Sequence, residues 1–238
     1  MAGALLGCER AMSSPLAVGV LVSAGLDSAC LLHRLLGEGR EVHPLYVRCG
    51  LRWERGELAA LRRLLRRMRR RRLARLRVLA VPLDSLYGAH WSTTGRAVPG
   101  AFSDDRAVYL PGRNVVLLSA AAIVGARGGF QDVALGVLRG NPFGDASPRF
   151  FALMARSLSQ ALGRRIRVLA PLSRMRKAQV IREAAGAVPI DLTVSCLRPR
   201  GLIHCGRCNK CAERKRAFRE ARIADPTRYQ RPAKGVDS

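Results

Sequence analysis

Short apolar segments that alternate with segments of helical character limit the fold of this chain more than any other feature. The apolar segments cover residues 16–22, 41–49, 77–83, 132–138 and 166–172. Strands that alternate with helices form parallel sheets whose two faces are covered by the helices. The sequence therefore predicts an α/β fold, a Rossmann-like parallel sheet of about five strands with helices on both faces.

Helix signals and loop signals divide the rest of the chain. Helices are expected over residues 27–36, 52–76, 115–126, 148–162, 176–186 and 209–223. The stretches 84–108 and 139–148 show no clear period and are rich in Gly, Ser and Pro, which is typical of active-site loops. No internal repeat is visible. Residues 1–15 are interpreted as a loose leader and residues 224–238 as a flexible tail.

The charge of the chain is strongly positive, with a formal net charge of +25 and 42 basic residues. A nucleic acid or another phosphate-rich partner is one explanation, and a GC-rich genome that favours arginine codons is the other. We favour the second explanation for most of the charge. The arginine block of residues 61–77 carries its apolar side chains on one helical face, so it is expected to be a solvated outer helix. Direct RNA contact by this block is the less favoured alternative.

The cysteine count and the terminal sequence indicate the compartment. The chain has seven cysteines, an odd number, and its N-terminus lacks the pattern of a secretion signal. A disulfide framework is therefore not expected. The chain also has no uninterrupted apolar run of about 18 residues, so no membrane span is predicted. These features predict a cytoplasmic, reduced protein that is not bound to a membrane.

The first apolar segment ends in "SAGLDS", Ser23 to Ser28, directly before a helix. In parallel sheets, ligands bind at the carboxyl ends of strands, and the N–H groups of a helix start favour anions. Gly25 allows the backbone to approach a ligand closely. Asp27 would repel a phosphate, so it either caps the helix or holds a metal ion that bridges phosphates. The segment is neither a Walker loop nor a dinucleotide fingerprint.

Four cysteines lie within sixteen residues near the C-terminus: Cys196, Cys205, Cys208 and Cys211. Four thiolates with two short spacers suit a tetrahedral Zn²⁺ site, and a site with no open position is structural rather than catalytic. An iron–sulfur cluster is the main alternative. His204 would be a substitute ligand, but four cysteines are preferred. The sequence thus predicts one structural zinc ion in a C-terminal appendage.

Several motifs in the same order resemble those of one family. "SAGLDS" resembles the Ser-Gly-Gly-x-Asp-Ser loop of the ATP-pyrophosphatase superfamily, with Ala24 in place of the first glycine. "YLPGRN" at 109–114, "APLSRMRKAQVI" at 170–181 and the segment "TVSC…HCGRCNKC", with Arg214 just beyond it, resemble the remaining motifs of 7-cyano-7-deazaguanine synthases. Together, these motifs make the resemblance far more specific than any single one.

The resemblance implies an activity and a division of the chain. These enzymes use ATP to convert 7-carboxy-7-deazaguanine and ammonia into the nitrile 7-cyano-7-deazaguanine, through adenylated intermediates, as a step toward queuosine or archaeosine. It implies an ATP-pyrophosphatase-type domain over residues 16–195 and a zinc appendage with a helix over residues 196–223. A homodimer is implied by the family alone. The expected partners are the deazaguanine-type substrate, ATP with Mg²⁺, and ammonia.

The resemblance also assigns residues by motif. The expected catalytic residues are Asp27, Arg113 and Lys177, and the expected ATP loop comprises Val22, Ser23, Ala24, Gly25, Leu26, Asp27 and Ser28. Asn114, Asp145 and Arg149 are expected to contact the substrate. A side-chain methyl at residue 24 fits only if the φ angle there is negative.

Two loops depart from the family pattern. Residues 48–57 replace its usual Gln-Arg-His segment, and residues 139–151 replace its usual Ser-Gly-Tyr-Pro-Asp-Cys loop. Two alternatives therefore remain open. One is a related ATP-pyrophosphatase that adenylates another carboxylate or amide, or tRNA itself in a thiolation-type modification. The other is a non-catalytic zinc and nucleic-acid binding module, which would leave the phosphate-type loop without a purpose.

Overall fold

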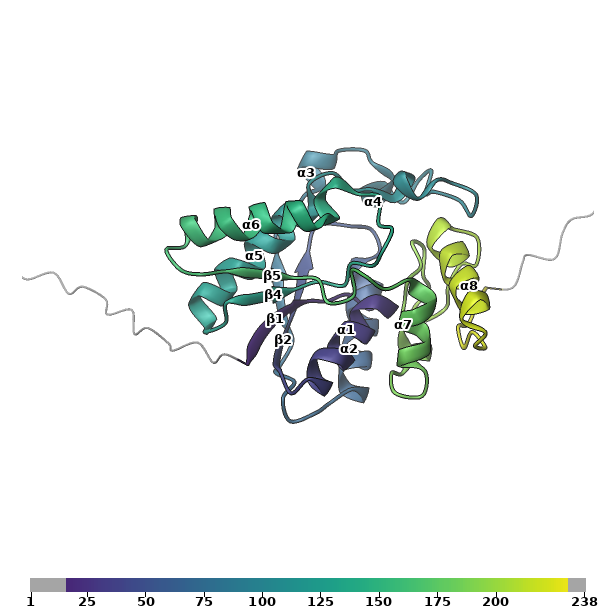
Figure 1. The fold of residues 1–238 in the computed structure, drawn as a ribbon. Helices are drawn as coiled ribbons and strands as arrows, with labels where there is room; N and C mark the ends of the chain where they lie inside the picture. The colour runs from purple at the N-terminus through teal and green to yellow at the C-terminus, as the bar shows by residue number, and fades with distance from the viewer. Residues whose placement is uncertain (1–15, 231–238) are drawn as a thin grey trace, which may run out of the picture.

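The structure is a computed structural model that describes residues 16–230 (Figure 1). Five strands form one sheet in the order β3-β2-β1-β4-β5, and all four neighbouring pairs are parallel. The strands are β1 (Ala17–Leu21), β2 (Glu41–Arg48), β3 (Arg77–Ala80), β4 (Asp132–Ala134) and β5 (Arg167–Leu169). The predicted α/β fold with a five-stranded parallel sheet is therefore confirmed.

The longer helices lie on both sides of this sheet, and the last of them packs on another helix. They are α1 (Leu26–Gly37), α2 (Glu54–Arg67), α5 (Arg113–Gly128), α6 (Pro148–Ala161), α7 (Lys177–Ala184) and α8 (Asn209–Ala221). Helices α1, α2, α7 and α8 contribute to one apolar core, and α5 and α6 contribute to the other (Figure 1). In β1, Val18 and Val20 belong to the first core, whereas Ala17 and Leu21 belong to the second. Successive strand side chains point to opposite faces, so β1 is the layer that separates the two cores.

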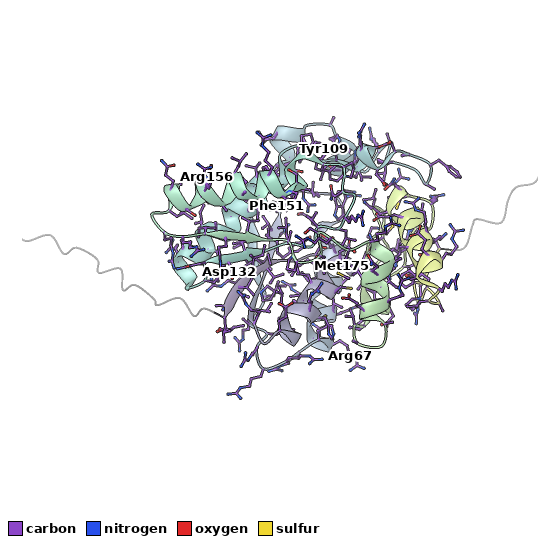
Figure 2. The ribbon with its side chains drawn as sticks, viewed as in Figure 1. Arg67, Tyr109, Asp132, Phe151, Arg156 and Met175 are labelled. Carbon is purple, nitrogen blue, oxygen red and sulfur yellow. The ribbon has the colours of Figure 1, made fainter. Side chains whose placement is uncertain are left out.

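Side chains follow the same division between core and solvent. Phe151 of α6 is 5% exposed and lies toward the sheet, whereas Arg67 and Arg156 are exposed on their helices (Figure 2). Asp132 at the start of β4 is only 2% exposed, and the Arg167 guanidinium donates to both of its carboxylate oxygens at 2.5 and 2.7 Å. Arg40 pairs with the same carboxylate. A buried carboxylate needs such partners, and this one links β4 to β5 and to the residue before β2.

The helix expected over residues 52–76 is wrong beyond Arg67. Helix α2 ends there, and the chain then runs beside β2, where Val42 donates to the Arg72 carbonyl at 2.8 Å and accepts from the Ala74 amide at 2.9 Å. A continued helix would have kept closely spaced arginines on adjacent turns, and like charges at that spacing are destabilising. The ten arginines of the block are all exposed, as expected for a solvated face.

Smaller differences occur in the loops and at the ends of the described chain. The stretch 84–108, expected to be a loop, contains the short helices α3 (Asp84–Tyr87), α4 (Trp91–Thr94) and η1 (Asp105–Val108). The helix start at Ser147 is as expected, because its hydroxyl accepts from the Phe150 amide at 3.2 Å. The short helices η2 (Gly144–Ala146) and η3 (Ile190–Leu192) complete the elements.

The C-terminal segment packs on the domain. Helix α8 lies beside α7 (Figure 1), and the core that contains α1 continues into the cysteine cluster. Residues 224–230, expected to be part of a flexible tail, run along this cluster: the His204 amide donates to the Arg228 carbonyl and the Gln230 amide to the His204 carbonyl, both at 2.8 Å. The leader, 1–15, and the last residues, 231–238, lie outside the described part of the chain.

Within residues 16–230, no helix has the length and apolar character needed to cross a bilayer.

Candidate active site and metal centre

The carboxyl ends of β1 and β4 lie next to each other at the centre of the sheet. The chain leaves β1 through α1 toward β2, and it leaves β4 through α6 toward β5 on the other side. Ligands of open α/β sheets bind where the strand order reverses in this way. The two loops touch there: a Cβ atom at Gly136 would lie 3.3 Å from both the carbonyl carbon and the carbonyl oxygen of Asp27. The absence of a side chain at Gly136 therefore allows the loop after β4 to support the loop after β1.

The loop after β1 presents its backbone N–H groups to this crevice. Helix α1 begins at Leu26, and its N-cap residue, Gly25, makes no side-chain capping bond. The loop holds its own shape, because the Gly25 amide donates to the Ser23 hydroxyl at 3.0 Å and the Ser23 amide donates to the Ser28 hydroxyl at 3.1 Å. The first-turn N–H groups of α1 are thus free for an anion. Asp27 lies within that turn and is not the helix cap.

The residue that departs from the family loop fits without strain. Among the described residues, only Ala97 and Arg222 have a positive φ outside glycine, so Ala24 has the negative φ that its methyl group requires. Ala24 is fully buried, and its carbonyl accepts from the Val194 amide at 2.7 Å. The replacement of a family glycine by Ala24 is therefore compatible with the loop conformation.

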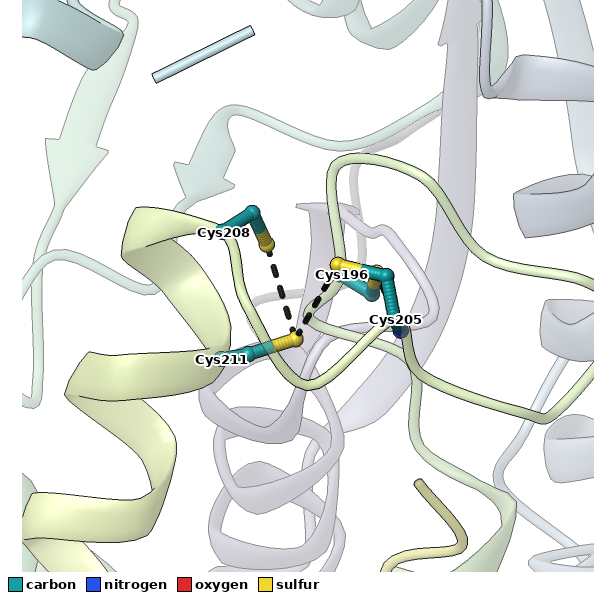
Figure 3. Close-up of side chains that lie close together, drawn as sticks. All are labelled: Cys196, Cys205, Cys208 and Cys211. Carbon is teal, nitrogen blue, oxygen red and sulfur yellow. Dashed lines mark hydrogen bonds between the residues drawn. The ribbon is translucent and has the colours of Figure 1, made fainter. Parts of the chain in front are cut away.

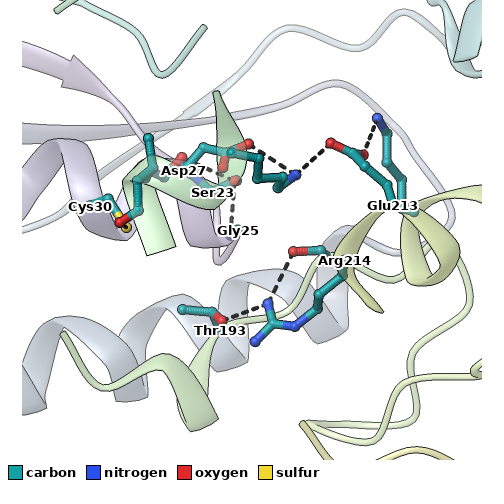
Figure 4. Close-up of polar contacts among 12 residues, drawn as sticks. Ser23, Gly25, Asp27, Cys30, Thr193, Glu213 and Arg214 are labelled. Carbon is teal, nitrogen blue, oxygen red and sulfur yellow. Dashed lines mark hydrogen bonds and ion pairs between the residues drawn. The ribbon is translucent and has the colours of Figure 1, made fainter. Parts of the chain in front are cut away.

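Asp27 begins a chain of alternating charges that reaches α8 (Figure 4). The Lys177 ammonium lies 3.3 Å from the Asp27 carboxylate and 2.7 Å from that of Glu213, and Lys210 lies 2.8 Å from Glu213. The other Asp27 oxygen, Oδ1, is buried and has no hydrogen-bond partner among the described residues. A buried carboxylate oxygen without a donor is a suitable ligand for a cation.

Electrostatics keep these groups charged. Burial lowers the pKa of Lys177, but Asp27 and Glu213 raise it more, so the net shift is upward. Burial also raises the pKa of Glu213, but Lys177 and Lys210 overcome this effect and lower it to about 2. The pair of Lys177 and Glu213 therefore stays ionised at neutral pH, and Lys177 is a permanent cation beside the loop.

The low pKa of Glu213 predicts a specific dependence of stability on pH. A carboxyl whose pKa is depressed by folding stabilises the protein above its unfolded pKa, and that stabilisation is lost as pH falls. We expect Glu213→Gln to lower the free energy of unfolding at pH 6, and the difference from wild type to shrink as pH falls from 4.5 toward 2. Urea denaturation at pH 6 and pH 3 measures this difference.

The matched control for this prediction is Glu38→Gln, which removes an exposed pair with Arg34 at 3.5 Å. Exposed pairs contribute little, so this variant should differ from wild type by less than about 1 kcal/mol at both pH values. A Glu213→Gln difference that stays constant down to pH 3 would contradict the proposed ionic coupling.

Arg113 is the first residue of α5 and borders the same crevice. Its N-cap, Gly112, has a φ of +72°, a conformation that favours glycine, and this turn carries Arg113 toward the loop after β1. The Arg113 Nε atom is buried and has no hydrogen-bond partner among the described residues. A guanidinium with an unused donor in a crevice is suited to bind a carboxylate or a phosphate.

The three residues expected to contact substrate differ in position. The backbone N–H of Asn114 donates to the Asp145 carboxylate at 3.1 Å, and the side-chain NH₂ of Asn114 donates to the Asp145 backbone carbonyl at 2.9 Å. Burial raises the pKa of Asp145. These two residues line a recess of about 260 Å³ behind the loop after β1. Arg149 is exposed on α6 and lines neither this recess nor the main cleft.

The main cleft has a volume of about 490 Å³ and contains the loop after β1, Arg113 and Lys177. Sequence reasoning missed several further side chains that line it, among them Trp53, Glu57, Trp91 and Glu213. Glu213 lies among basic residues of α8, and nothing in its local sequence distinguishes it. The other three belong to residues 48–57 and 84–108, which were identified only as loops of unusual composition or sequence.

The four C-terminal cysteines form a compact cluster (Figure 3). All four sulfurs lie within 4.8 Å of one another, and those of Cys208 and Cys211 are 3.5 Å apart. Tetrahedral ligands at about 2.3 Å from zinc lie about 3.8 Å from each other. The amides of Arg198 and Cys205 donate to the Cys196 sulfur, both at 3.2 Å, which favours a thiolate. The donor set and its spacing fit a four-coordinate metal ion.

Neither His204, the substitute ligand, nor the buried thiol of Cys30 contributes to this cluster. The His204 Nε2 atom accepts from the Ser195 amide at 3.0 Å, and burial together with nearby Arg214 lowers the pKa of this ring to about 4. Cys30 is buried elsewhere, near the Val180 carbonyl, and burial raises its pKa to about 12. Neither residue is part of the four-sulfur cluster.

Arg214, which follows the cysteine motif, connects the cluster to the loop after β1. It is fully buried and donates to the hydroxyls of Thr193 at 2.9 Å and Thr227 at 2.6 Å (Figure 4). The neighbouring residue Val194 holds the Ala24 carbonyl at 2.7 Å. Arg214 thus stabilises the segment on which the loop after β1 rests.

Comparison with known proteins gives one family. The family model described as "Queuosine biosynthesis protein QueC" matches residues 17–222. This chain belongs to the QueC family. The 7-cyano-7-deazaguanine synthase of Anaeromyxobacter dehalogenans is 35% identical, covering 88% of this chain and 94% of the relative. That of Stutzerimonas stutzeri is 33% identical, covering 88% and 96%. A predicted subunit of tRNA methyltransferase from Methanocaldococcus jannaschii has a similar structure over 71% of this chain and 75% of its own, with a TM-score of 0.46 and 17% identity.

The extent of the QueC match agrees with the arrangement of the site. It begins at the first residue of β1 and ends at Arg222, the C-cap of α8. It therefore includes the loop after β1, Arg113, Lys177 and the whole cysteine cluster. In this member of the QueC family, these features are parts of one continuous structure, since α8 carries both Cys211 and Glu213.

Proposed function

We propose that this chain uses ATP to convert 7-carboxy-7-deazaguanine and ammonia into 7-cyano-7-deazaguanine. The observation that carries the proposal is the loop of Ser23 to Ser28 at the crevice of the sheet, beside Asp27 and Lys177, in a member of the QueC family. The relatives with 31–36% identity carry the name of this activity. The proposal also explains why a guanidinium with an unpartnered Nε atom and a carboxylate with an unpartnered oxygen lie in the same cleft.

Binding of the triphosphate is the first task of the site. The free N–H groups at the start of α1 and the ammonium of Lys177 would hold the departing β- and γ-phosphates of ATP. Negative charge accumulates on pyrophosphate as it leaves, and preformed donors stabilise that charge without reorganisation. Asp27 would hold Mg²⁺ through its unpartnered oxygen, and a bound Mg²⁺ would neutralise phosphate charge.

The reaction then needs two rounds of activation. The substrate carboxylate attacks the α-phosphorus of ATP, pyrophosphate leaves, and ammonia displaces AMP to form the amide. The amide oxygen next attacks the α-phosphorus of a second ATP and expels a second pyrophosphate, and loss of AMP and two protons then leaves the nitrile. Arg113 would orient the carboxylate for the first attack, and its position at the border of the cleft supports this role.

Several further features belong to the proposal. Zn²⁺ bound by Cys196, Cys205, Cys208 and Cys211 would stabilise the C-terminal segment and take no part in the chemistry, since four thiolates leave no open position. We expect a cytoplasmic protein that forms a homodimer. Light scattering of the purified protein tests the dimer. Asn114 and Asp145 are proposed to border the substrate side of the site. Arg149 is proposed to act only if its helix approaches bound substrate.

Mass spectrometry of the purified protein with 7-carboxy-7-deazaguanine, ATP, Mg²⁺ and ammonium tests the proposal. The expected products are the nitrile, AMP and pyrophosphate. Formation of AMP and pyrophosphate with a different carboxylate, and none with this one, would contradict the proposed substrate while keeping the adenylation chemistry. No nucleotide cleavage with any carboxylate would contradict the enzyme class.

A further inference from the structure

Two tryptophans form one wall of the main cleft. Trp53 follows β2 and Trp91 begins α4, and their rings stack with centroids 5.6 Å apart and planes 16° apart. The two segments are joined by a hydrogen bond from the Arg52 amide to the Ser92 carbonyl at 2.8 Å. Trp91 Nε1 is buried and has no hydrogen-bond partner among the described residues. This pair is a rigid aromatic surface at the edge of the crevice.

Glu57, in the first turn of α2, presents a carboxylate to the same cleft. One of its oxygens accepts from the Tyr46 hydroxyl at 2.8 Å, and the other has no hydrogen bond within the described residues. Burial raises the pKa of Glu57, against the opposing effects of Arg113 and Tyr46. Within residues 16–230, Glu57 makes no ion pair, whereas Glu213 pairs with two lysines. A half-buried carboxylate with one oxygen open to the cleft gains from a ligand that brings hydrogen-bond donors.

The base of a deazaguanine has the complementary edge. Its N1–H and 2-amino groups are adjacent donors, and one carboxylate accepts from both. Its flat ring suits an aromatic wall, and the carboxylate on its five-membered ring suits a guanidinium. Adenine, in contrast, has an acceptor at N1, which a carboxylate repels. Of the two bases that the reaction brings together, the deazaguanine fits Glu57 better than the adenine of ATP.

We propose that Glu57 determines specificity by accepting hydrogen bonds from the guanine-type edge of the substrate, whose ring lies against Trp53 and Trp91. This inference rests on the proposed function and adds to it the residues that recognise the base. Arg113 would then face the other end of the same substrate, near the loop that holds ATP. On this proposal, residues 48–57, which depart from the family pattern, supply Trp53 and Glu57 to the base site.

Steady-state kinetics of Glu57→Gln tests the proposal. The amide keeps the shape of the side chain and its acceptor for Tyr46, but its NH₂ group opposes the donors of the base. We expect the KM for 7-carboxy-7-deazaguanine to rise about 10- to 100-fold, because a paired contact to a base edge contributes on that order. The KM for ATP should stay within about 2-fold, since ATP makes no contact with Glu57 in this proposal. Trp53→Leu should raise the KM for the same substrate and leave that for ATP unchanged.

A second measurement changes the substrate, so its first result comes from the wild-type protein alone. The same substrate without its 2-amino group should have a KM raised by a similar factor in wild type and by much less in Glu57→Gln. Glu38→Gln, an exposed change on α1, is the control and should match wild type.

The outcomes separate the two proposals. A wild-type protein that makes the nitrile, with Glu57→Gln unchanged or altered only in the KM for ATP, would overturn the base site and leave the function standing. A wild-type protein that fails to convert the substrate would overturn both.

Discussion

Asp27→Asn is expected to reduce kcat/KM for pyrophosphate release by on the order of 10³-fold while the fold is retained. The substitution changes charge but hardly changes shape, so the packing of the loop against Gly136 should persist. It removes the negative charge that would hold Mg²⁺ and that pairs with Lys177 at 3.3 Å. Lys177 keeps its second partner, Glu213, at 2.7 Å, so it is not left as an uncompensated buried cation. A coupled assay for pyrophosphate and a thermal unfolding curve measure the two effects.

Asp191→Asn is the matched control for this prediction, since Asp191 is exposed and lines neither the cleft nor the recess behind the loop. It should have wild-type turnover and a wild-type melting temperature. Unchanged pyrophosphate release by Asp27→Asn would remove the proposed metal role. A large loss of melting temperature would mean that Asp27 stabilises the fold and that its effect on turnover is indirect.

Cys208→Ser is expected to lose the bound metal and a large part of the protein's stability. Structural zinc contributes on the order of 10–16 kcal/mol to the folding of small zinc domains, and a hydroxyl is a poor replacement for a thiolate. The cluster is part of the core that includes α1 and α7, so its loss should destabilise more than the C-terminal segment. The segment that holds the Ala24 carbonyl would also lose its support, which should lower turnover. Elemental analysis and thermal unfolding are the measurements.

Cys30→Ala is the control for the cysteine prediction. Cys30 is also buried, but its sulfur lies outside the four-sulfur cluster, near the Val180 carbonyl. This variant should keep one metal ion per chain and lose about 1 kcal/mol or less, as expected for removal of one small buried group. A Cys208→Ser protein that retains the metal and its wild-type stability would refute the four-cysteine site.

Local sequence patterns were enough to predict the order and type of the main elements. The five strands and the helices that follow them were recognised from apolar runs and from helix signals such as Ser147 and Pro148. The cysteine cluster was predictable because its short spacers bring the ligands together with little help from the rest of the chain. The largest boundary error is the end of α2. There, residues 72–74 form hydrogen bonds with β2 instead of continuing the helix that their local sequence favours.

The ion pairs of the site could not be predicted in this way. Lys177 and Glu213 are 36 residues apart in the sequence, and their contact depends on how α8 packs on α7. Trp53 and Trp91 stack where a hydrogen bond between residues 52 and 92 joins two segments that are distant in sequence. Pairings of this kind depend on the packed arrangement of whole elements, which local periodicity does not encode.

The sequence by itself determined the fold class, the family and the chemical character of the site, because these depend on residue types at short spacings. Only the tertiary structure decided which groups are left with unused hydrogen-bonding capacity: the Asp27 Oδ1 atom, the Arg113 Nε atom and one oxygen of Glu57. Burial removes water from a polar group, and its remaining partners come from elements that are far away in sequence. For this reason the positions where a ligand would complete the structure became visible only in the folded protein.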